Sequence, residues 1–413
     1  LMYFCSKNKY QDMKTLTERC IFNRLLPVVM IITASITVAC HNRGVNKESM
    51  EVKLSKDNLS SIEEVFSEID ICYLGDTVET EISGVVVSVQ MRDGIILVEG
   101  SEGVLYVYDY SGHFLGNSKN VRGKGRGEFN IMTGYTYNRY SKQIEVLTPV
   151  DLLFYDTNFR FLGKKRIPTE YPEQNKKGTF FRQICDISES RHIMLTSPLE
   201  NRQNELVLFD SNLLKEEYCI SYNDYEIAEI SMQEQSFFEL NSQQYLFFPN
   251  CVTNKVFIFD SNDENLVSYI KYTGEDLISA EDVKPFKNNR NKMLEYLAFK
   301  SAKIIPLRGM GNESLICTLF KAGGTTRDTY TSFFNVKNGN SKTIKNREKG
   351  VVNLPIFNRI EGDTLYAIVP PEDVKKMETL SILNKKSRQL IKTAPEDGKY
   401  AIAKYILSRR LSN

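Results

Sequence analysis

The chain has 413 residues, 41% of them hydrophobic, and its 53 Lys and Arg balance 52 Asp and Glu to a formal net charge of +1. This balance argues against a nucleic-acid partner, and three His in separate parts of the sequence argue against a multi-His zinc centre. Trp is absent, whereas 22 Tyr and 23 Phe favour β-strands. The length exceeds one ordinary compact domain but suits a closed array of small sheets.

The first 39 residues are predicted to be a signal peptide of the lipoprotein type. Its positively charged part contains Lys14, Arg19 and Arg24. The apolar run Leu25–Val38 that follows is too short to span a bilayer and is typical of a signal peptide. Its end, ITVAC, resembles a bacterial lipobox, in which the cysteine becomes the lipid-modified N-terminus. We therefore predict lipidation of Cys40. The alternative is a plain secretory peptide that is cut after Ala39.

Residues 40–59 are predicted to be the lipid anchor and a tether, and residues 60–413 the folded body. The segment His41–Asp57 is polar and has no hydrophobic period, which is typical of a tether. The body is expected to open with one helical turn, because Ser61–Glu64 has the pattern of a capping box, and then with a strand that ends near Tyr73.

Cysteine and histidine usage predicts neither a disulfide framework nor a catalytic triad. Five cysteines beyond the leader lie in or beside apolar strands: Cys72, Cys185, Cys219, Cys251 and Cys317. An odd number without C-x-x-C spacing is typical of small buried hydrophobic residues. His113 and His192 follow turn residues, and we expect both at surface turns. No cofactor and no metal are expected.

The body is predicted to consist of repeats, each with an apolar strand that ends in an acidic turn. The four turn aspartates are 47, 54 and 50 residues apart: Asp109, Asp156, Asp210 and Asp260. Such separations suit one four-stranded blade plus its loops. A fifth copy has Asn335 at the turn, after an insertion with a short amphipathic helix around Met293–Leu297. A sixth starts at Phe357, and Lys399–Leu407 is expected to supply the last strand.

Six candidate inner strands agree with the six repeats. They are Ser83–Val89, Ile131–Tyr137, Phe181–Ile187, Phe237–Leu240, Ser301–Leu307 and Asn353–Phe357. We therefore predict an all-β fold: a six-bladed β-propeller of four-stranded antiparallel blades with short helical insertions. A solenoid is the competing architecture, but its repeats are shorter and more regular. Within the blades, four residues are expected to be buried at equivalent positions: Val107, Phe154, Phe209 and Phe259.

Three segments resemble one known family. They are LYVYDYSGHFLG at the end of the first repeat, the loop GKGRGEF at Gly123–Phe129, and EIDICYLGDT at Glu68–Thr77. Together they resemble the six-bladed β-propeller lipoproteins of Bacteroides-type bacteria, relatives of NHL-repeat propellers. Arg126 stands where that family frequently has Pro. The resemblance implies the propeller fold and a location at the cell envelope, on the outer membrane.

The glycine-rich loop is the candidate ligand site. It presents Arg122, Lys124 and Arg126 within five residues, with Glu128 able to hold one of them. Its glycines leave backbone amides uncovered, so we predict an anionic ligand such as an acidic sugar or a partner carboxylate. The alternative is that the glycines and Glu128 only lock neighbouring blades together. A P-loop is excluded, because the spacing is wrong and a strand follows.

The leading functional hypothesis is a membrane-anchored, non-enzymatic binding or scaffolding module for a protein partner or an envelope glycan ligand. The alternative is a propeller enzyme, a lyase or glycan-active hydrolase, that uses carboxylates at the channel mouth. A sensory or scaffolding role beside a glycan-uptake system follows only from the family resemblance. We expect a monomer that contacts the membrane through the lipid on Cys40, with no nucleic-acid partner.

Overall fold

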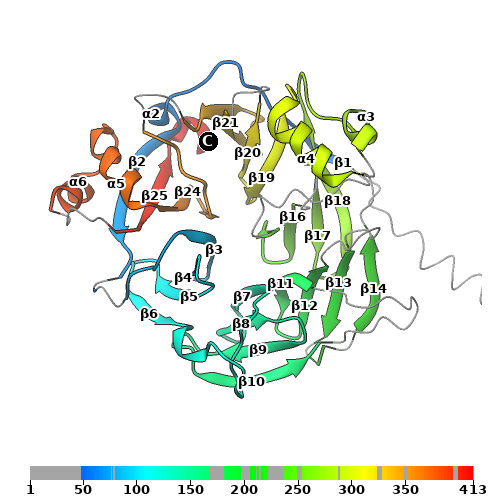
Figure 1. Cartoon of the computed structure of the whole chain (residues 1–413). Helices are drawn as coiled ribbons and strands as arrows, with labels where there is room; N and C mark the ends of the chain where they lie inside the picture. Colours follow the sequence, from blue (N-terminus) through cyan, green and yellow to red (C-terminus); the bar gives the residue numbers. More distant parts are fainter. Residues whose placement is uncertain are drawn as a thin grey trace, which may run out of the picture. The chain divides into compact units, whose positions relative to one another are not determined.

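The structure is a computed structural model, and it describes residues 48–75, 77, 80–167, 181–196, 205–210, 212–213, 215–221, 236–248, 254–286, 289–322, 328–347, 352–393 and 399–412. Their strands form six sheets around a common axis, as in a propeller (Figure 1). Each sheet, or blade, is named here after its innermost strand. The prediction of a six-bladed β-propeller with four-stranded antiparallel blades is confirmed.

Three blades are built from consecutive strands in the first half of the chain. The β3 blade contains β3 (Val86–Arg92), β4 (Ile95–Gly100), β5 (Leu105–Asp109) and β6 (Phe114–Asn117). The β7 blade contains β7 (Gly134–Asn138), β8 (Gln143–Leu147), β9 (Asp151–Tyr155) and β10 (Phe161–Arg166). The β11 blade contains β11 (Phe181–Ser188), β12 (Arg191–Thr196), β13 (Glu205–Asp210) and β14 (Lys215–Ser221).

The other three blades complete the ring, two of them with strands from the start of the described chain. The β15 blade contains β15 (Phe237–Glu239), β16 (Gln244–Phe247), β17 (Lys255–Asp260), β18 (Asn265–Thr273) and, as a fifth strand, β1 (Glu48–Lys53). The β19 blade contains β19 (Ile305–Gly311), β20 (Leu315–Lys321), β21 (Thr329–Asn335) and β22 (Ser341–Lys345). The β23 blade contains β23 (Arg359–Glu361), β24 (Thr364–Val369), β25 (Ala401–Leu407) and β2 (Phe66–Tyr73).

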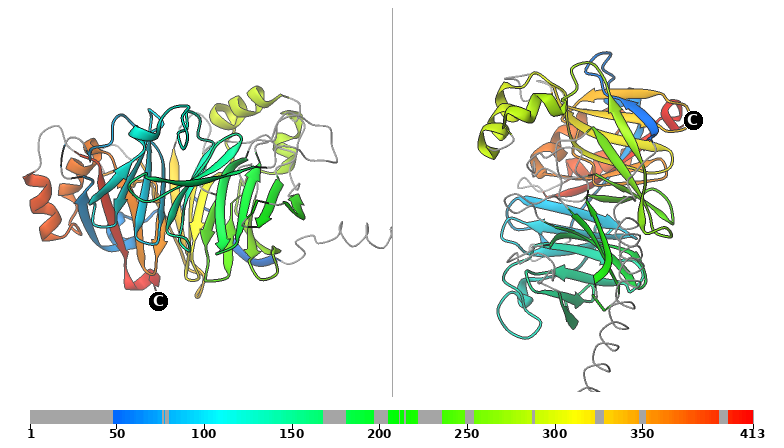
Figure 2. Two further views of the ribbon diagram at one scale, coloured as in Figure 1. Left: turned by 90° about the horizontal axis from the view of Figure 1, so that it is seen from below. Right: turned by 90° about the vertical axis from the view of Figure 1, so that its right-hand side faces the viewer.

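Short helices lie at the periphery of the strands (Figure 2). The α-helices are α2 (Ile62–Val65), α3 (Ala280–Val283), α4 (Arg290–Glu295), α5 (Pro371–Lys376), α6 (Lys385–Lys392) and α7 (Arg409–Ser412). The single turns η2 (Lys119–Val121), η3 (Lys284–Phe286), η4 (Tyr296–Lys300) and η5 (Met377–Thr379) accompany them. The expected helical turn is confirmed, and Ser61 caps it, because its side chain accepts a hydrogen bond from the Glu64 amide. Of the helices that the structure describes, none has the length and apolarity that crossing a bilayer requires.

The repeated acidic turn has one local cause. The Asp109 carboxylate accepts hydrogen bonds from two amides that follow it, those of Ser111 and His113. Asp156, Asp210, Asp260 and Asn335 make equivalent bonds to amides two to four residues further on. An Asx turn of this kind reverses the chain with the side chain of a single residue. The turn therefore recurs wherever that residue follows an apolar strand.

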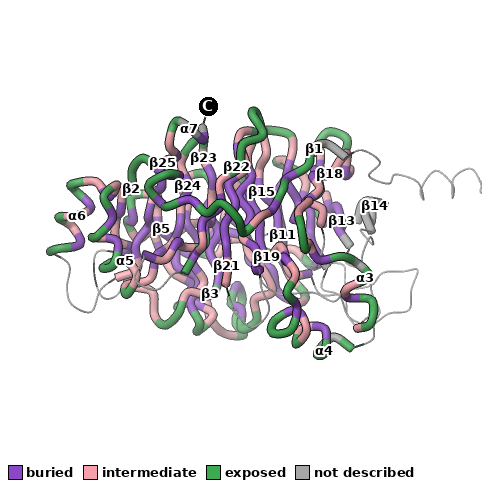
Figure 3. The backbone as a smooth tube through the Cα atoms, turned by 90° about the horizontal axis from the view of Figure 1, so that it is seen from above, coloured by how far each residue is buried: buried purple, intermediate pink, exposed green. Residues whose placement is uncertain are grey.

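The core lies between neighbouring blades. Leu97, Leu105 and Val107 of the β3 blade pack against Ile144 and Val146 of the β7 blade. Burying one such side chain contributes about 1.5–3 kcal/mol. Figure 3 shows the buried backbone concentrated along the strands, with the exposed residues in turns. Cys185 and Cys317 are buried and Cys72 is half-buried, all three as free thiols, so the expectation of buried apolar cysteines is confirmed for two of them.

The predicted set of equivalent core positions contains a one-residue slip. Val107 and Phe154 lie two residues before their turn aspartate, whereas Phe209 and Phe259 lie one residue before theirs. Side chains alternate along a strand, so these pairs face opposite sides of their blades. The equivalent residues directly before the turn are at most 1% exposed: Tyr108, Tyr155, Phe209 and Phe259. The predicted burial of Phe154 is wrong, because that side chain is only half-buried.

The expected tether contains a strand. Glu48–Lys53 pairs in parallel with β18 as the outer strand of the β15 blade, with partners such as Val52 and Tyr272. Val52 and Leu54 are fully buried, so part of this polar-looking segment packs into the core. The expectation of a tether is therefore wrong for these residues. Residues 41–47 lie outside the described residues.

Four inner strands begin later than predicted. β3 begins at Val86 rather than Ser83, β7 at Gly134 rather than Ile131, β19 at Ile305 rather than Ser301, and β23 only at Arg359. The predicted strand Asn353–Phe357 is wrong, since residues 352–358 carry no regular structure. Some apolar residues in these lead-in segments, such as Leu354 and Phe357, are buried without belonging to a strand, whereas Ile131 and Ile356 are exposed. Their apolar residues make these segments read as strands in the sequence.

Candidate functional site

The inner strands all run in the same direction along the axis. Each blade repeats one antiparallel order from the axis outward, so the starts of all inner strands gather at one end of the channel. We call this end the entry face; it includes Val85, Val87, Ile131, Arg182 and Ile356, which open or precede inner strands. The opposite end is called the far face.

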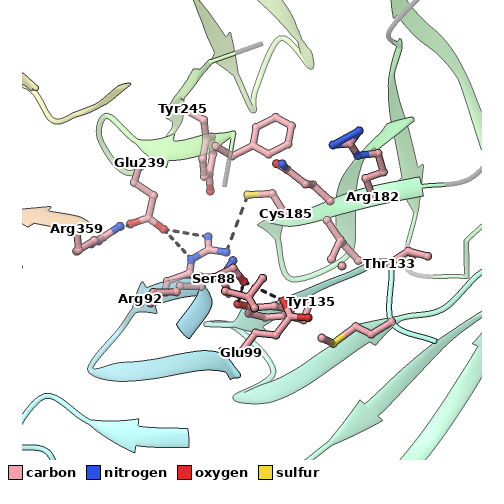
Figure 4. Close-up of a pocket in the computed structure, with 18 residues that line it drawn as sticks. Ser88, Arg92, Glu99, Thr133, Tyr135, Arg182, Cys185, Glu239, Tyr245 and Arg359 are labelled. Atoms are coloured by element: carbon pink, nitrogen blue, oxygen red, sulfur yellow. Dashed lines mark hydrogen bonds and ion pairs between the residues drawn. The ribbon is translucent and has the colours of Figure 1, made fainter. Parts of the chain in front are cut away.

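A cavity of about 190 Å³ lies on the axis (Figure 4). It is lined by residues of β3, β4, β7, β11, β15, β16 and β23, so side chains from five blades converge there. Val87 and Arg182, near the starts of their strands, are exposed or half-exposed, whereas Arg92, Cys185 and Tyr245 are buried. The cavity therefore opens at the entry face and has its floor deeper in the channel.

A carboxylate surrounded by three arginines forms the floor. Glu239 accepts hydrogen bonds from Arg92 at 2.9 and 3.1 Å, and it lies 2.9 Å from Arg139 and 3.2 Å from Arg359. Burial opposes ionisation of this side chain, but the three guanidinium groups outweigh it and hold the pKa of Glu239 below its usual value. Glu239 is therefore ionised at neutral pH, and its charge is fully compensated.

Arg92 also binds a second carboxylate deeper between the blades. Its Nη1 atom lies 2.5 Å from Asp186 Oδ1, and its Nη2 atom donates to the Asp186 carbonyl at 3.1 Å. Asp186 is fully buried, and this burial raises its pKa to about 7. Burial also raises the pKa of the adjacent Cys185 thiol to about 12, which makes it a poor nucleophile.

A second buried ion pair lies behind the first. His192 Nε2 is 3.1 Å from Glu145, and both side chains are almost fully buried. Burial lowers the pKa of His192, but the hydrogen bond and the charge of Glu145 outweigh it, so the pKa lies above its usual value. The expectation that His192 lies at a surface turn is wrong. That expectation is confirmed for His113, whose exposed ring contacts Asp109.

One cavity residue, Glu99, has the opposite electrostatic environment to Glu239. Burial raises the pKa of Glu99, and this outweighs a hydrogen bond from Ser88 at 3.1 Å and the charge of Arg122. The Ser88 hydroxyl also contacts the Tyr135 hydroxyl. Figure 4 shows Glu99 and Glu239 on different sides of the cavity. The cavity therefore contains one carboxyl whose pKa is raised and one whose pKa is lowered.

The predicted ligand loop lies on the entry face but beside the cavity. It connects the end of β6 to the start of β7, and of the described residues that line the cavity none belongs to Arg122–Glu128. Lys124 and Arg126 are exposed and Arg122 is half-buried. Among the loop residues, Arg122 is the one whose charge reaches a cavity side chain, that of Glu99. The loop and the cavity are thus neighbours on one face.

The contacts within this loop support blade locking. Glu128 accepts a hydrogen bond from the Gly125 amide at 2.8 Å. Arg122 donates to the Gly103 carbonyl at 3.0 Å and lies over the Phe129 ring. Gly127 has a positive φ of 75°, and a side chain at this position would collide with Phe161. Lys124 and Arg126 take no part in these contacts. Ligand binding by these two side chains stays a prediction.

Comparison with known proteins identifies the family. A family model described as 6-bladed beta-propeller matches residues 41–355, well over half of the chain. The chain belongs to this 6-bladed beta-propeller family. A search of the curated proteins finds no match for this propeller.

One solved structure supports the fold of the propeller. A Bacteroides fragilis protein described as a candidate exported protein matches with a TM-score of 0.66 at 13% identity, over 87% of this chain and 99% of that chain. A Bacteroides caccae protein of unknown function matches with a TM-score of 0.37 at 11% identity, over 63% of this chain and 81% of that chain. At these identities, the first likeness shows the fold and no more.

The sequence contained a signal for the cavity residues of the propeller. Arg92 and Arg182 lie in or beside segments that were predicted to be inner strands, and inner strands line the axis. A charged residue in an otherwise apolar inner strand therefore points to the channel. Glu239 and Arg359 belong to the two shortest inner strands, of three residues each, where the alternation is too brief to read. Among the described residues, no cluster of three or more His, Cys, Asp or Glu side chains could hold a metal.

The buried Asp186 should make the stability of the propeller depend on pH. Its pKa rises from 3.8 to about 7 on folding, so the folded state holds an extra proton between these values, and the free energy of unfolding should fall as pH rises from about 4 to about 7. The raised pKa of His192 acts in the same direction at higher pH. Urea unfolding of Asp186→Asn at pH 5 and 7.5 should show a smaller difference than wild type. The exposed Asp263→Asn variant serves as the control, and equal slopes in both variants would contradict the assignment.

Proposed function

We propose that this propeller is a lipid-anchored binding protein of the cell envelope, and that the axial cavity receives an anionic group of its ligand. The supporting observation is the charge of the cavity. Arg92, Arg182 and Arg359 line it against two carboxyl groups, Glu99 and Glu239. Three arginines against two carboxyl groups leave the lining with an excess of positive charge, and burial, which raises the pKa of Glu99, acts in the same direction.

The geometry of Arg359 explains how an anion is held. Its Nε atom lies 3.3 Å from Glu361 and its Nη2 atom 3.2 Å from Glu239, which fix the guanidinium plane. In the described part of the chain, its Nη1 atom has no hydrogen-bond partner. A fixed guanidinium with an unused donor is a preorganised site for a carboxylate, because the side-chain entropy is already spent.

The binding role is tested with small carboxylates. Glucuronate should bind the purified chain in saturation-transfer NMR, and glucose, which has the same ring without the carboxylate, should not. Arg359→Gln should weaken glucuronate binding at least tenfold with an unchanged fold. Arg160→Gln, at an exposed turn, should leave it unchanged. Equal signals from both sugars, or from both variants, would contradict the proposal.

The anchor is the second part of the proposal. The lipobox-like ITVAC motif supports lipid attachment at Cys40, and several acyl chains at about 0.8 kcal/mol per buried methylene give a stable anchor on the outer membrane. In detergent phase partitioning, wild type should enter the detergent phase and Cys40→Ala the aqueous phase. If Cys40→Ala stays bound to the membrane although its signal peptide is cleaved normally, the proposal of a lipid anchor at Cys40 is wrong.

A second candidate function, glycan hydrolysis, is favoured by the opposite pKa shifts of Glu99 and Glu239. A carboxyl with a raised pKa and one with a lowered pKa match the acid and the base of a glycosidase. Binding is nevertheless favoured, because three arginines occupy the Glu239 oxygens that would have to attack or activate water. Turnover of nitrophenyl glycosides by wild type that Glu99→Gln abolishes would reverse this preference.

A further inference from the structure

Exposed apolar side chains gather at the entry face. Of the described residues, nine large hydrophobic side chains are exposed: Leu59, Val85, Val87, Ile131, Tyr140, Val150, Leu162, Phe299 and Ile356. The two most exposed lie just before inner strands: Val85 at 68% directly precedes β3, and Ile131 at 63% lies three residues before the start of β7. Ile356 at 51% precedes β23, and Val87 at 47% belongs to the start of β3. These four residues, called the apolar ring, lie at the starts of the inner strands of three neighbouring blades, at the entry end of the channel.

The apolar ring is continuous with the cavity. Val87 lines the cavity as well as facing solvent, and Met132 follows Ile131 directly into the lining. Contiguous exposed apolar surface around a concave site is typical of a protein-interaction surface, because branched aliphatic side chains offer no hydrogen bonds to a free sugar. A flat bilayer would cover the ring without filling the charged cavity inside it.

The charges on the entry face limit the chemistry of the occupant. Lys124 and Arg126 are exposed beside the apolar ring, and Arg182 and Arg359 line the cavity. Two carboxylates on this face are already engaged, Glu128 by the Gly125 amide and Glu102 by the Ser83 hydroxyl. A segment that complements this face therefore carries negative charge together with apolar side chains.

We infer that the entry face docks an acidic segment of a partner protein, in which one carboxylate side chain enters the axial cavity and the flanking apolar residues cover the ring. The inference rests on the proposed function, because it uses the same cavity, and it deepens that function by naming the partner chemistry. The glycine-rich loop then contributes through long-range attraction by Lys124 and Arg126. Its structural contacts stay intact in the complex.

The test uses a displayed library of random dodecapeptides, selected on the purified full chain. Enriched peptides should combine Asp or Glu with aliphatic or aromatic neighbours. One selected peptide, labelled with a fluorophore, is then titrated by anisotropy. The double variant Val85→Ser/Ile131→Ser should weaken its binding at least tenfold, and so should Lys124→Glu/Arg126→Glu. The charge-reversal variant should also reduce the salt dependence of binding.

Matched controls lie away from the entry face. Leu162→Ser removes an exposed aliphatic side chain, 49% exposed, at the start of the outer strand β10. Lys337→Glu reverses an exposed charge in the turn after β21, which lies at the far face because β21 runs parallel to the inner strand β19. Both should change peptide binding less than twofold, and the melting temperatures of all variants should match wild type.

The outcomes separate the two proposals. The inference would be overturned if the selected peptides showed no acidic preference, or if they bound the ring variants normally. If glucuronate binding still depended on Arg359, the proposed function would stand. Failure of both probes would overturn both. If the chain bound no peptide but sedimented with phosphatidylethanolamine–phosphatidylglycerol vesicles, and did so through the apolar ring, the inference would be overturned. The occupant of the entry face would then be a membrane surface.

Discussion

Replacing Arg92 with methionine should lower the free energy of unfolding by about 3–5 kcal/mol, the usual cost of removing one partner of a buried ion pair. Arg92 is 5% exposed and neutralises Asp186, which is fully buried, as well as part of the charge of Glu239. Methionine keeps much of the side-chain volume and removes the charge. Two carboxyl groups are then left with less compensation, one of them, Asp186, fully buried.

Urea unfolding at pH 7.5 measures this effect. The exposed Arg160→Met variant is the control and should change stability by less than about 0.5 kcal/mol. The double variant Arg92→Met/Asp186→Asn should recover part of the loss, because the second substitution removes a carboxylate that Arg92 had neutralised. An Arg92→Met protein as stable as its control would mean that water or another group compensates Asp186.

The features that could be predicted from the sequence are those that a few neighbouring residues determine. The Asx turns at Asp109, Asp156 and Asp260 depend on amides two to four residues away, so their spacing predicted the repeat and the number of blades. The helical turn after Ser61 depends on one side chain and one amide. Local hydrogen bonds of this kind depend on neighbouring residues, so they can be predicted from the sequence.

The features that could not be predicted depend on residues far apart in the chain. β1 is a strand only because the edge of β18, more than 200 residues later, offers it hydrogen bonds, and its own sequence has no alternating pattern. The one-residue slip at Val107 arose because both faces of a blade are buried, so apolar residues no longer alternate with polar ones.

The candidate site depends on the same long-range convergence. Arg92, Glu239 and Arg359 belong to three blades and meet only after the ring closes, whereas Arg122–Glu128 is contiguous and attracts attention in a sequence. The loop and the cavity nevertheless share the entry face, because the loop leads from an outer strand to an inner one. We propose the same preference for an anion for the neighbouring set of arginines in the cavity, and for the loop itself it stays a prediction.

Phe66→Ala should lower the free energy of unfolding by about 3–5 kcal/mol, because Phe66 lies where the ring of blades closes. Phe66 is fully buried at the start of β2, and its ring centroid lies 5.0 Å from that of Tyr405 and 5.4 Å from that of Phe333. These two residues belong to β25 and β21, so one side chain connects the closing blade to its neighbour. Its removal leaves a cavity at the place where the two ends of the ring meet without a covalent link.

Phe299→Ala is the matched control for this closure, because it makes the same chemical change at a side chain that is 47% exposed. Its unfolding free energy should stay within about 0.5 kcal/mol of wild type. Because β2 pairs with β25 along its whole length, loss of the Phe66 ring should lower the stability of the propeller in a single cooperative transition, seen together by circular dichroism and tyrosine fluorescence. Two separate transitions, or an equal loss in both variants, would show that the β23 blade unfolds independently and that Phe66 does not hold the ring closed.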